Sequence, residues 1–552
     1  MSNNKTAIVI GSGFGGLNTA GELALRGWRV TVLEKHSREG GMQSYFSRAG
    51  VDFDASFHFL YLPDRPTPTN IVGRLVKHLM PISNMMTWRA EDFSFESGPN
   101  LGSLVSGLIA RFPDQEAAIR AYTADLDKIA NHSMEVKTIL VEKGMQAALG
   151  AMQSDPEAQA MGQLSAQQLL DKHFPGGIDP RLLMVLMGFR RFLGEQPGEL
   201  SLVSWAILWK SLEHGAWMCR PGSGVKQLLA EYLKLITEAG GQVRLNSEVK
   251  RILVEATPQG VEVARGVELA DGTQLRADVV VSACALPILG AMVPGGMPKL
   301  FAPKPAPEGA APAQAPAPRG PMRLSPACDA LYVALRNTPR TAELLAPFRS
   351  RSIWFNSAAD LAQAQTHLDA LNAELGAEGR DPEEVLDRHP MGLFATLTAP
   401  PPGTDRAYVL SCSFHHPVSP ANFQLSPAAY AAWKQRRLAG MLAGLERCLG
   451  SLHPGGAFGR GFLHEMTLCA ELATDRTLHR YTGSPLGCIY GPANIPAQSI
   501  FSRPPVTAIP GLWLAGQWAL GGPGMTGCMV GAGMIAAEID RAAAAPAPVA
   551  AN

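Results

Sequence analysis

The stretch Ala7-Ile8-Val9-Ile10-Gly11-Ser12-Gly13-Phe14-Gly15-Gly16 decides the fold, because it joins an apolar run to a glycine-rich turn and a helix-like segment. Gly11 permits a tight turn out of a strand, Gly13 lets the backbone approach a pyrophosphate, and Gly16 lets the next helix pack closely on the sheet. The N-terminus of that helix offers free N–H groups and the positive end of its dipole to phosphate. The stretch therefore predicts a nucleotide site at the first strand–helix turn.

A second apolar run, Val30-Thr31-Val32-Leu33, ends at Glu34, close to the spacing of about 20 residues that such sites have between the glycines and an acid. A carboxylate there can accept both ribose hydroxyls and would repel the 2′-phosphate of NADP. A lone GxGxxG is a weak signal, but the strand, the helix and the acid together predict a dinucleotide site. The cofactor contacts predicted from this part of the chain are Gly11, Ser12, Gly13, Phe14, Gly15, Gly16, Glu34 and Lys35.

Two further glycine-rich segments favour FAD. Arg38-Glu39-Gly40-Gly41-Met42-Gln43-Ser44 brings a glycine doublet toward the ribityl–pyrophosphate stretch, although an ordinary turn is the alternative. Near the other end, Gly511-Leu512-Trp513-Leu514-Ala515-Gly516-Gln517 leads into a glycine-dense run from which Gly524-Met525-Thr526 should open the last helix. The N–H groups of that helix would stabilise negative charge on the reduced ring. The contacts predicted here are Gly40, Gly41, Met42, Gln43, Ser44, Gly516, Gln517, Gly524, Met525 and Thr526.

Together these segments resemble the flavoprotein superfamily of carotenoid desaturases and isomerases, retinol saturase and, more distantly, amine oxidases. Arg38-x-Gly40-Gly41 is similar to the second FAD motif of that family, with Met42 at the usual place of a basic residue. The stretch from Gly50 to Phe59 is similar to the family's G-x-x-F-D-x-G-x-H pattern, with Ser56 replacing its last glycine. The block from Tyr481 to Gly491 resembles one that is typical of the desaturase branch.

The resemblance implies an FAD-dependent oxidoreductase that moves a hydride at a C–H bond next to unsaturation, by desaturating or saturating an apolar polyene or isoprenoid. It implies that His58 lies near the flavin as a catalytic proton donor or acceptor, the alternative being a histidine packed in a loop. It also implies that Val249 contacts the adenine through its backbone, although a plain buried strand valine fits equally well. Gln517 stands where the last FAD motif often carries Asp, and it brings no charge.

The predicted fold class is α/β: a Rossmann-type FAD-binding domain assembled from discontinuous segments, with an α+β substrate domain. A chain of 552 residues exceeds what one hydrophobic core usually supports. The FAD-binding domain is predicted to comprise residues 1–70, 215–290 and 475–540, and the substrate domain residues 71–214 and 291–474. Within the latter, the Ala/Pro tract 302–321 is expected to be a flexible loop, and 541–552 a disordered tail.

The amino-acid composition limits the kinds of ligand and macromolecule that the protein is expected to bind. Lys+Arg and Asp+Glu are equal at 48, and no basic stripe suggests nucleic acid, whereas 17% charged residues suit a protein that handles apolar molecules. Eight cysteines without a CxxC pair predict reduced thiols in a cytoplasmic enzyme, and the polar start leaves no room for a signal peptide. The uncharged stretch Pro504–Ala537 matches a flavin motif better than a membrane span. Leu182–Phe189 predicts a buried core helix, or alternatively a substrate entrance in peripheral membrane contact.

Several alternatives stay open. No second GxGxxG follows a strand, so the electron partner is expected to be oxygen, a quinone or a docking protein, or else an external donor. A flavin-dependent isomerase and a C–N (amine) oxidase are alternative reactions, and a non-catalytic carrier of the dissociation-inhibitor type is the alternative outside enzymes. His415-His416 invites a metal interpretation, but no Asp, Glu or Cys stands at ligand spacing nearby, so no metal is predicted. Trp518 and Cys528 are secondary candidates for positions near the ring.

Overall fold

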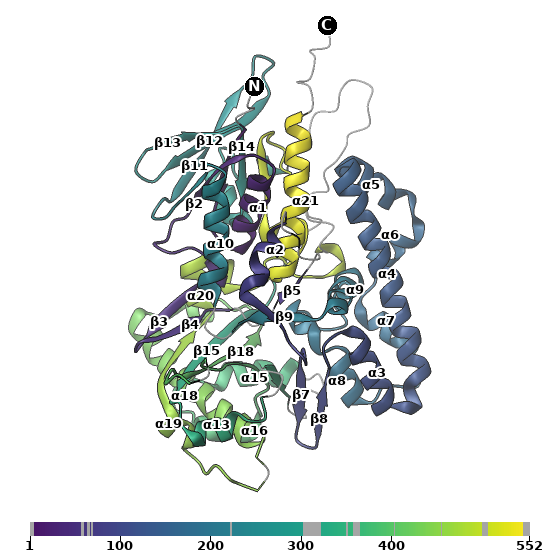
Figure 1. Ribbon diagram of the computed structural model, residues 1–552, viewed down its shortest axis with the longest axis vertical. Helices are drawn as coiled ribbons and strands as arrows, with labels where there is room; N and C mark the ends of the chain where they lie inside the picture. Colours follow the sequence, from purple (N-terminus) through teal and green to yellow (C-terminus); the bar gives the residue numbers. More distant parts are fainter. Residues whose placement is uncertain are drawn as a thin grey trace.

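A parallel five-stranded sheet carries both ends of the chain (Figure 1). Its strands are, in spatial order, β10 (Gln242–Arg244), β2 (Arg29–Leu33), β1 (Thr6–Ile10), β14 (Val279–Ser282) and β20 (Leu512–Leu514). Every neighbouring pair is parallel. The inner strands are near-continuous apolar runs, as expected where both faces of a sheet are covered. Three distant segments thus build one Rossmann-type sheet, and the predicted α/β fold class is confirmed.

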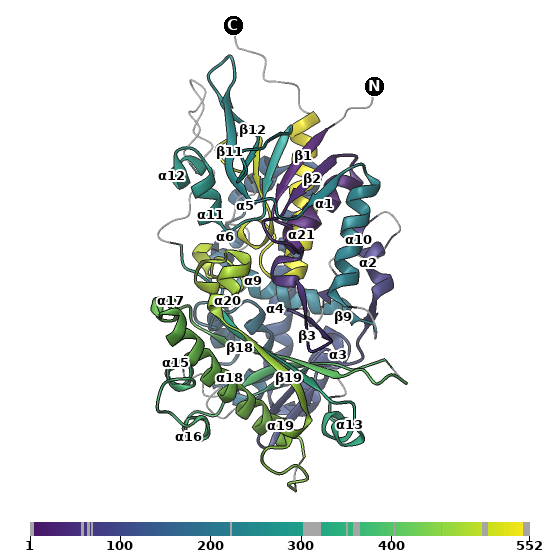
Figure 2. The ribbon, with the colours of Figure 1, turned by 90° about the vertical axis from the view of Figure 1, so that its left-hand side faces the viewer.

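Helices and a β-meander cover this sheet. Helices α1 (Phe14–Leu25) and α10 (Val225–Glu238) pack against each other, and α1 also packs against α21 (Gly524–Ala544). The antiparallel meander of β11 (Val249–Ala256), β12 (Glu262–Leu269) and β13 (Gln274–Arg276) lies on the other side of the sheet from α10 (Figure 2). The residues described by this computed structural model are 5–56, 60–62, 67, 70–220, 224–301, 322–348, 352–356, 365–401, 403–453, 455–498 and 506–544.

A second, seven-stranded sheet forms the other half of the molecule. Its strands are, in order, β19 (Thr467–Ala473), β15 (Ala327–Leu335), β18 (Tyr408–His416), β17 (Leu393–Thr398), β16 (Ser352–Phe355), β7 (Thr87–Ala90) and β8 (Phe93–Glu96). All pairs are antiparallel except β16 with β7. One face packs on a helical layer through a common apolar core. That layer consists of α13 (Pro339–Leu345), α15 (Gln365–Glu374), α16 (Pro382–Arg388), α18 (Pro427–Gly450) and α19 (Phe462–Met466).

A helical region beside both sheets has its own core. It contains α3 (Leu101–Arg111), α4 (Glu116–Lys143), α5 (Met145–Ser154), α6 (Pro156–Gly162), α7 (Ala166–His173), α8 (Pro180–Leu186) and α9 (Leu202–Ser211). The apolar run that begins at Leu182 packs into this core through Leu182, Val185, Leu186 and Phe189, as the core-helix interpretation predicts. Among the described residues, no helix is both long and apolar enough to cross a membrane.

Shorter elements connect these layers. They are β3 (Tyr45–Arg48), β4 (Val51–Asp54), β5 (Leu60–Tyr61), β6 (Leu79–Pro81), β9 (Ala216–Cys219), α2 (Ile71–Leu75), α11 (Leu286–Met292), α12 (Gly296–Leu300), α17 (Ala421–Gln424) and α20 (Asp475–Thr482). The hairpin of β3 and β4 reaches from the first nucleotide loop to the seven-stranded sheet, where Phe46 and Phe53 contact Tyr332 of β15.

The predicted domain boundaries remain a prediction, but two of their parts can be compared with the chain. The prediction that the tail begins at residue 541 is wrong, because α21 continues to Ala544. Arg541 donates from Nη2 to the carbonyl oxygen of Val141 at 2.7 Å, and the alanines that follow favour helix. The Ala/Pro tract 302–321 and residues 545–552 lie outside the described residues.

A buried ion pair ties the seven-stranded sheet to its helices. Arg437 of α18 is fully buried and donates from Nε to Oδ2 of Asp329 on β15 at 2.7 Å. Its other nitrogens donate to the carbonyl oxygen of Leu375 and to the side chain of Asn372. Burial alone would raise the pKa of Asp329, but Arg437 and the nearby His416 ring outweigh it and lower the pKa to about 2. The pair is therefore charged at neutral pH and holds α18 in register with β15.

We expect Asp329→Asn to lower the free energy of unfolding by about 3–5 kcal/mol at pH 7, because it leaves the Arg437 charge buried without its partner. The stabilisation is fully present above pH 3.8, the usual pKa of Asp, and is lost as the pH falls toward about 2. Chemical unfolding at pH 7 and pH 3 measures both effects. Glu116→Gln, which breaks the exposed Arg120–Glu116 pair, is the control and should cost less than about 1 kcal/mol. Equal effects of the two substitutions would contradict the structural role of Asp329.

Candidate functional site

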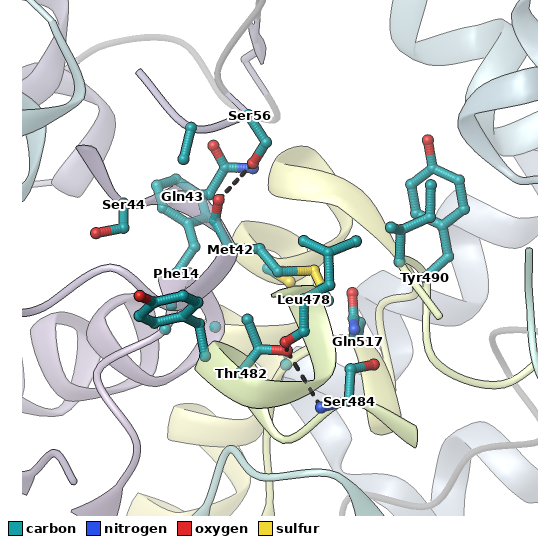
Figure 3. A pocket seen from close by; sticks show the side chains of 18 of the residues that line it. Phe14, Met42, Gln43, Ser44, Ser56, Leu478, Thr482, Ser484, Tyr490 and Gln517 are labelled. Carbon is teal, nitrogen blue, oxygen red and sulfur yellow. Dashed lines mark hydrogen bonds between the residues drawn. The ribbon is translucent and has the colours of Figure 1, made fainter. Parts of the chain in front are cut away.

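A single cavity of about 1550 Å³ lies between the two sheets and reaches the helical region. All predicted cofactor-binding residues line it except Ser12 and Gly40. Figure 3 shows Phe14, Met42 and Gln517 around the same space, although they come from the beginning and the end of the chain. His58, the predicted catalytic residue, lies outside the described residues, and its role stays a prediction.

The first glycine loop has the shape that its sequence predicts. Gly11 adopts a φ of +95°, which L side chains rarely adopt. A Cβ at Gly16 would lie 2.1 Å from the carbonyl oxygen of Gly11, so the helix could not start so close to the strand with any other residue. A Cβ at Gly13 would meet no atom within 4 Å, and Gly13 lines the cavity. The space beside Gly13 is therefore a cradle that a side chain would fill.

Both ends of the chain meet directly at this loop. A Cβ at Gly15 would lie 2.4 Å from the Cα of Gly516, so the two backbones are in contact. The glycine doublet closes on the same loop: a Cβ at Gly41 would lie 2.9 Å from the Cα of Gly13, and the Gly40 N–H donates to the carbonyl oxygen of Ser12 at 3.0 Å. Gly40 thus supports the loop from behind, which explains why it does not line the cavity.

Glu34 lies where a ribose-binding acid should lie, at the end of β2. Its side chain is 7% exposed. Oε2 accepts hydrogen bonds from the backbone N–H and the hydroxyl of Ser12, at 2.9 and 2.8 Å, and Oε1 accepts one from the backbone N–H of His36 at 2.9 Å. Oε1 keeps an acceptor site for a ribose hydroxyl, whereas Ser12 uses both acceptor sites of Oε2. Ser12 acts through Glu34 and is not itself part of the lining.

The predicted ring end of the site is assembled from three segments. Gly524 and Met525 begin α21, so the free N–H groups of that helix lie at the cavity. The hydroxyl of Thr526 donates to the carbonyl oxygen of Tyr61 at 2.7 Å, which fixes the first turn of α21 to β5. Ser56, which replaces a family glycine, donates to the carbonyl oxygen of Met42 at 2.5 Å and so fixes the loop after the doublet.

The predicted adenosine end gains contacts that sequence reasoning missed. Val249, at the start of β11, lines the cavity, as predicted for a residue near the adenine. The turn after β14 also lines it, through Ala283, Cys284 and Ala285, followed by Ile288. Nothing in their residue types marks them as a site. Only the pairing of β14 with β1 in the sheet would have placed them here.

The seven-stranded sheet supplies the opposite wall, which sequence reasoning also missed. Alternate residues of three strands face the cavity: Cys328, Ala330 and Tyr332 of β15, Phe394 of β17, and Ser411, Ser413 and His415 of β18. Their register is direct, since Cys328 pairs with His415, Ala330 with Ser413 and Tyr332 with Ser411. This wall is apolar or neutral apart from His415 and from Glu471 of β19, whose carboxylate pairs with Arg48.

The pair His415-His416 is divided between the two faces of β18, as strand alternation requires. His415 lines the cavity, whereas His416 is buried on the other face, with Nε2 at 3.7 Å from Oδ1 of Asp329. In the part of the chain that the structure describes, no three His, Cys, Asp or Glu side chains are grouped to hold a metal.

Tyr490 is the second proton-bearing side chain beside His415. It comes from the block that resembles desaturases, and the two rings lie 6.1 Å apart in an edge-on arrangement. Burial raises the pKa of Tyr490 well above its ordinary value, so the phenol keeps its proton at neutral pH. Burial likewise raises the pKa of the Cys328 thiol on the facing wall. Both groups are therefore neutral.

These features fit a dinucleotide with a long, bent shape. An acid with a spare acceptor lies at Glu34, an open cradle at Gly13 and a helix N-terminus at Gly524, all along one cavity. The residues that would hold FAD are present in this order, from adenosine to ring. The fold and the site together define a Rossmann-type flavin-dependent oxidoreductase.

Comparison with known proteins specifies the family. The family model described as "Flavin containing amine oxidoreductase" matches residues 14–322, more than half of the chain. The chain belongs to this family. This match confirms the predicted superfamily, with FAD as the cofactor and an oxidoreductase as the class of enzyme.

The similar proteins come from more than one branch. All-trans-retinol 13,14-reductase of Rattus norvegicus is 28% identical over 283 residues, which cover 48% of this chain and 45% of that protein. The neurosporene-forming phytoene desaturase of Cereibacter sphaeroides is 30% identical over 294 residues, 51% of this chain and 53% of that protein. The chain spans about half the length of these curated relatives. Cyclohexylamine oxidase from Brevibacterium oxydans has a TM-score of 0.54 at 16% identity, covering 98% of this chain and 99% of that one, a likeness of fold alone.

We expect Gly13→Val to abolish FAD retention while the protein still folds, because the added side chain occupies the cradle and its Cβ meets no protein atom within 4 Å. Gly15→Ala should instead destabilise the fold itself, because its Cβ has no room against Gly516. Flavin absorbance per protein after gel filtration and the melting temperature of the apoprotein separate the two effects. Stoichiometric FAD in Gly13→Val would refute the assignment of this loop to the pyrophosphate.

Proposed function

We propose that the chain catalyses FAD-dependent hydride transfer at a carbon–carbon bond, desaturating or saturating an apolar, unsaturated substrate such as a polyene or isoprenoid. The observation that carries the proposal is the single cavity that joins the dinucleotide loops to an apolar chamber. A volume of about 1550 Å³ exceeds the range of roughly 300–1,000 Å³ that is usual for one small ligand, so a cofactor and a long substrate fit together.

The walls of the chamber suit a hydrocarbon. Phe192 and Phe394 pack against each other with ring centroids 5.8 Å apart, and Ile207 and Leu208 of α9 face the same cavity. Burial of apolar surface against such walls contributes about 25 cal/mol per Å², which favours long apolar ligands. The same walls exclude water from the reacting bond.

Each part of the reaction then has a residue or a cofactor assigned to it. When bound, FAD supplies the hydride acceptor or donor. The glycine loops hold its phosphates, and the N-terminus of α21 favours negative charge at its position. Tyr490 keeps its phenol proton and lines the chamber, so it is the proposed proton donor when a double bond is saturated. In the desaturating direction the substrate loses a proton, which needs a separate acceptor. His58, at its place in the Gly50–Phe59 motif, remains a second proposed proton carrier.

The relatives support the choice of a carbon–carbon bond, since one is named as a retinol reductase and the other as a phytoene desaturase. They leave both directions open, and the isomerase alternative uses the same chamber. The electron acceptor is proposed to be oxygen or a quinone, with an external donor in the saturating direction. A cytoplasmic location belongs to the same proposal. The buried packing of Leu182–Phe189 gives no support for peripheral membrane contact through that run.

We expect anaerobic incubation of the oxidised holoenzyme with a partly saturated polyene to bleach its visible flavin absorption. For the opposite direction, the photoreduced holoenzyme should regain that absorption when a more highly conjugated polyene is added. Cyclohexylamine and putrescine serve as the amine controls and should have no effect. Bleaching by an amine and by no polyene would overturn the proposal in favour of C–N oxidation. A protein that takes up no flavin on reconstitution would instead favour the carrier alternative.

We expect Tyr490→Phe to lower turnover about 10²-fold or more while FAD content stays unchanged, because only the proton-bearing oxygen is removed. Substrate affinity, measured by titration of the oxidised holoenzyme, should change little. Tyr408→Phe is the matched control, since that side chain does not line the cavity. If Tyr490→Phe turned over at the wild-type rate, Tyr490 would contribute only packing and would not donate a proton.

A further inference from the structure

One side of the cavity is made by three helices, and we refer to it as the helical wall. Its members are Met134 and Lys137 of α4, Ser204, Ile207, Leu208 and Ser211 of α9, and Val530 and Met534 of α21. Helix α4 packs against both α9 and α21. The helical wall is part of the same cavity as the dinucleotide loops, so a ligand can extend from the flavin position along it.

One face of helix α9 packs against α4, and another face lines the cavity. Trp205 and Trp209 are buried toward α4, where the indole N–H of Trp205 donates to the hydroxyl of Tyr122 at 2.8 Å. Ser204, Ile207, Leu208 and Ser211 recur at helix spacing on the face toward the cavity. An apolar strip with a hydroxyl at each end therefore faces the ligand space.

Lys137 is the one charged side chain among the described cavity-lining residues of α4, α9 and α21. It is partly buried, and it forms no ion pair within the described residues. Two other lysines on these helices do have carboxylate partners: Lys128 pairs with Glu157, and Lys210 pairs with Asp127 at 2.7 Å. A partly buried ammonium that lacks a counter-ion and faces a ligand cavity is a site for an anionic group from outside the chain.

We propose that Lys137 binds the anionic head group, carboxylate or phosphate, of a substrate whose apolar chain lies along the helical wall. The aliphatic stem of a lysine packs along apolar surface while its ammonium reaches the polar end of the ligand. The two serine hydroxyls of the α9 strip lie about 10 Å apart along the helix axis, and the hydroxyl of Ser211 already donates to the carbonyl oxygen of Leu208. The contact with the head group is therefore assigned to Lys137 alone. This inference rests on the proposed function and narrows its substrate class from a hydrocarbon to an apolar chain with one charged end.

The test uses the oxidised holoenzyme and two matched ligand pairs, titrated by calorimetry without turnover. One pair is cis-parinarate, a polyene carboxylate, and its methyl ester. The other is geranylgeranyl phosphate and geranylgeraniol. In at least one pair we expect the anion to bind about tenfold more tightly than its neutral partner, as a charge-assisted hydrogen bond would provide. The pair that shows the preference identifies the head group.

Three variants test whether Lys137 causes this preference. Lys137→Met should abolish the preference by weakening only the anion, and Lys137→Arg should retain it. Lys143→Met, in the exposed last turn of the same helix, is the control and should leave every affinity unchanged. Equal binding of anion and neutral partner by the wild type, no binding of any of the four ligands, or an undiminished preference in Lys137→Met would each overturn the inference. Because no turnover is involved, a ligand that binds with this preference but never changes the flavin spectrum refutes the redox proposal alone.

Discussion

The contact between Gly15 and Gly516 is the constraint on which the rest of the site depends. Residues five hundred positions apart touch through backbone atoms, and a Cβ at Gly15 would lie 2.4 Å from Gly516. This contact sets α21 beside α1 and so fixes the distance between the phosphate loop and the N-terminus of the last helix. A cofactor that contacts both the phosphate loop and the N-terminus of α21 can bind only if Gly15 and Gly516 pack this closely. Packing at this point is therefore a functional requirement, and its cost in backbone entropy is offset by the core that the helices bury.

The second half of the site depends on strand alternation. Strands β15 and β18 each present one set of side chains to the cavity and the intervening set to the helical layer behind. The same alternation separates His415 from His416 and sends Asp329 to its ion pair with Arg437. A slip of one residue in this register would bring a buried carboxylate into the apolar chamber and expose the thiol of Cys328 to the core of helices. The buried ion pair thus helps to specify which face is the chamber wall, as well as joining the sheet to α18.

The sequence allowed the cofactor half to be predicted, because its chemistry is local. Each of its features can be recognised within a few residues of sequence: a turn of glycines, an acid at the end of the next strand, and the start of a helix. Ser12 and Gly40 were predicted as contacts but act through Glu34 and through the first loop, a distinction that needs coordinates. The substrate half could not be predicted in this way. Cys328, Phe394 and His415 become neighbours only through strand pairings between distant segments, and their residue types are common in any core. Likewise, the alanines after residue 541 predicted a tail, whereas helix α21 continues through them to Ala544. Arg541 of this helix donates a hydrogen bond to the carbonyl oxygen of Val141 in α4.

The chamber wall also bears on which reaction the family fold performs here. Solved amine oxidases share the fold at 16% identity or less, so the fold alone does not select the substrate. An amine substrate is a cation at neutral pH, and it is bound best by a carboxylate or by the faces of aromatic rings. The described sheet face offers serines, a thiol, aromatic rings and the Glu471 carboxylate, which is paired with Arg48. The helical wall offers Lys137, which forms no ion pair within the described residues. A like charge on the ligand would cost free energy at Lys137, whereas a neutral chain or one with an anionic end would not. At the helical wall, the charge of Lys137 therefore disfavours a cationic amine relative to a neutral chain or a chain with an anionic end.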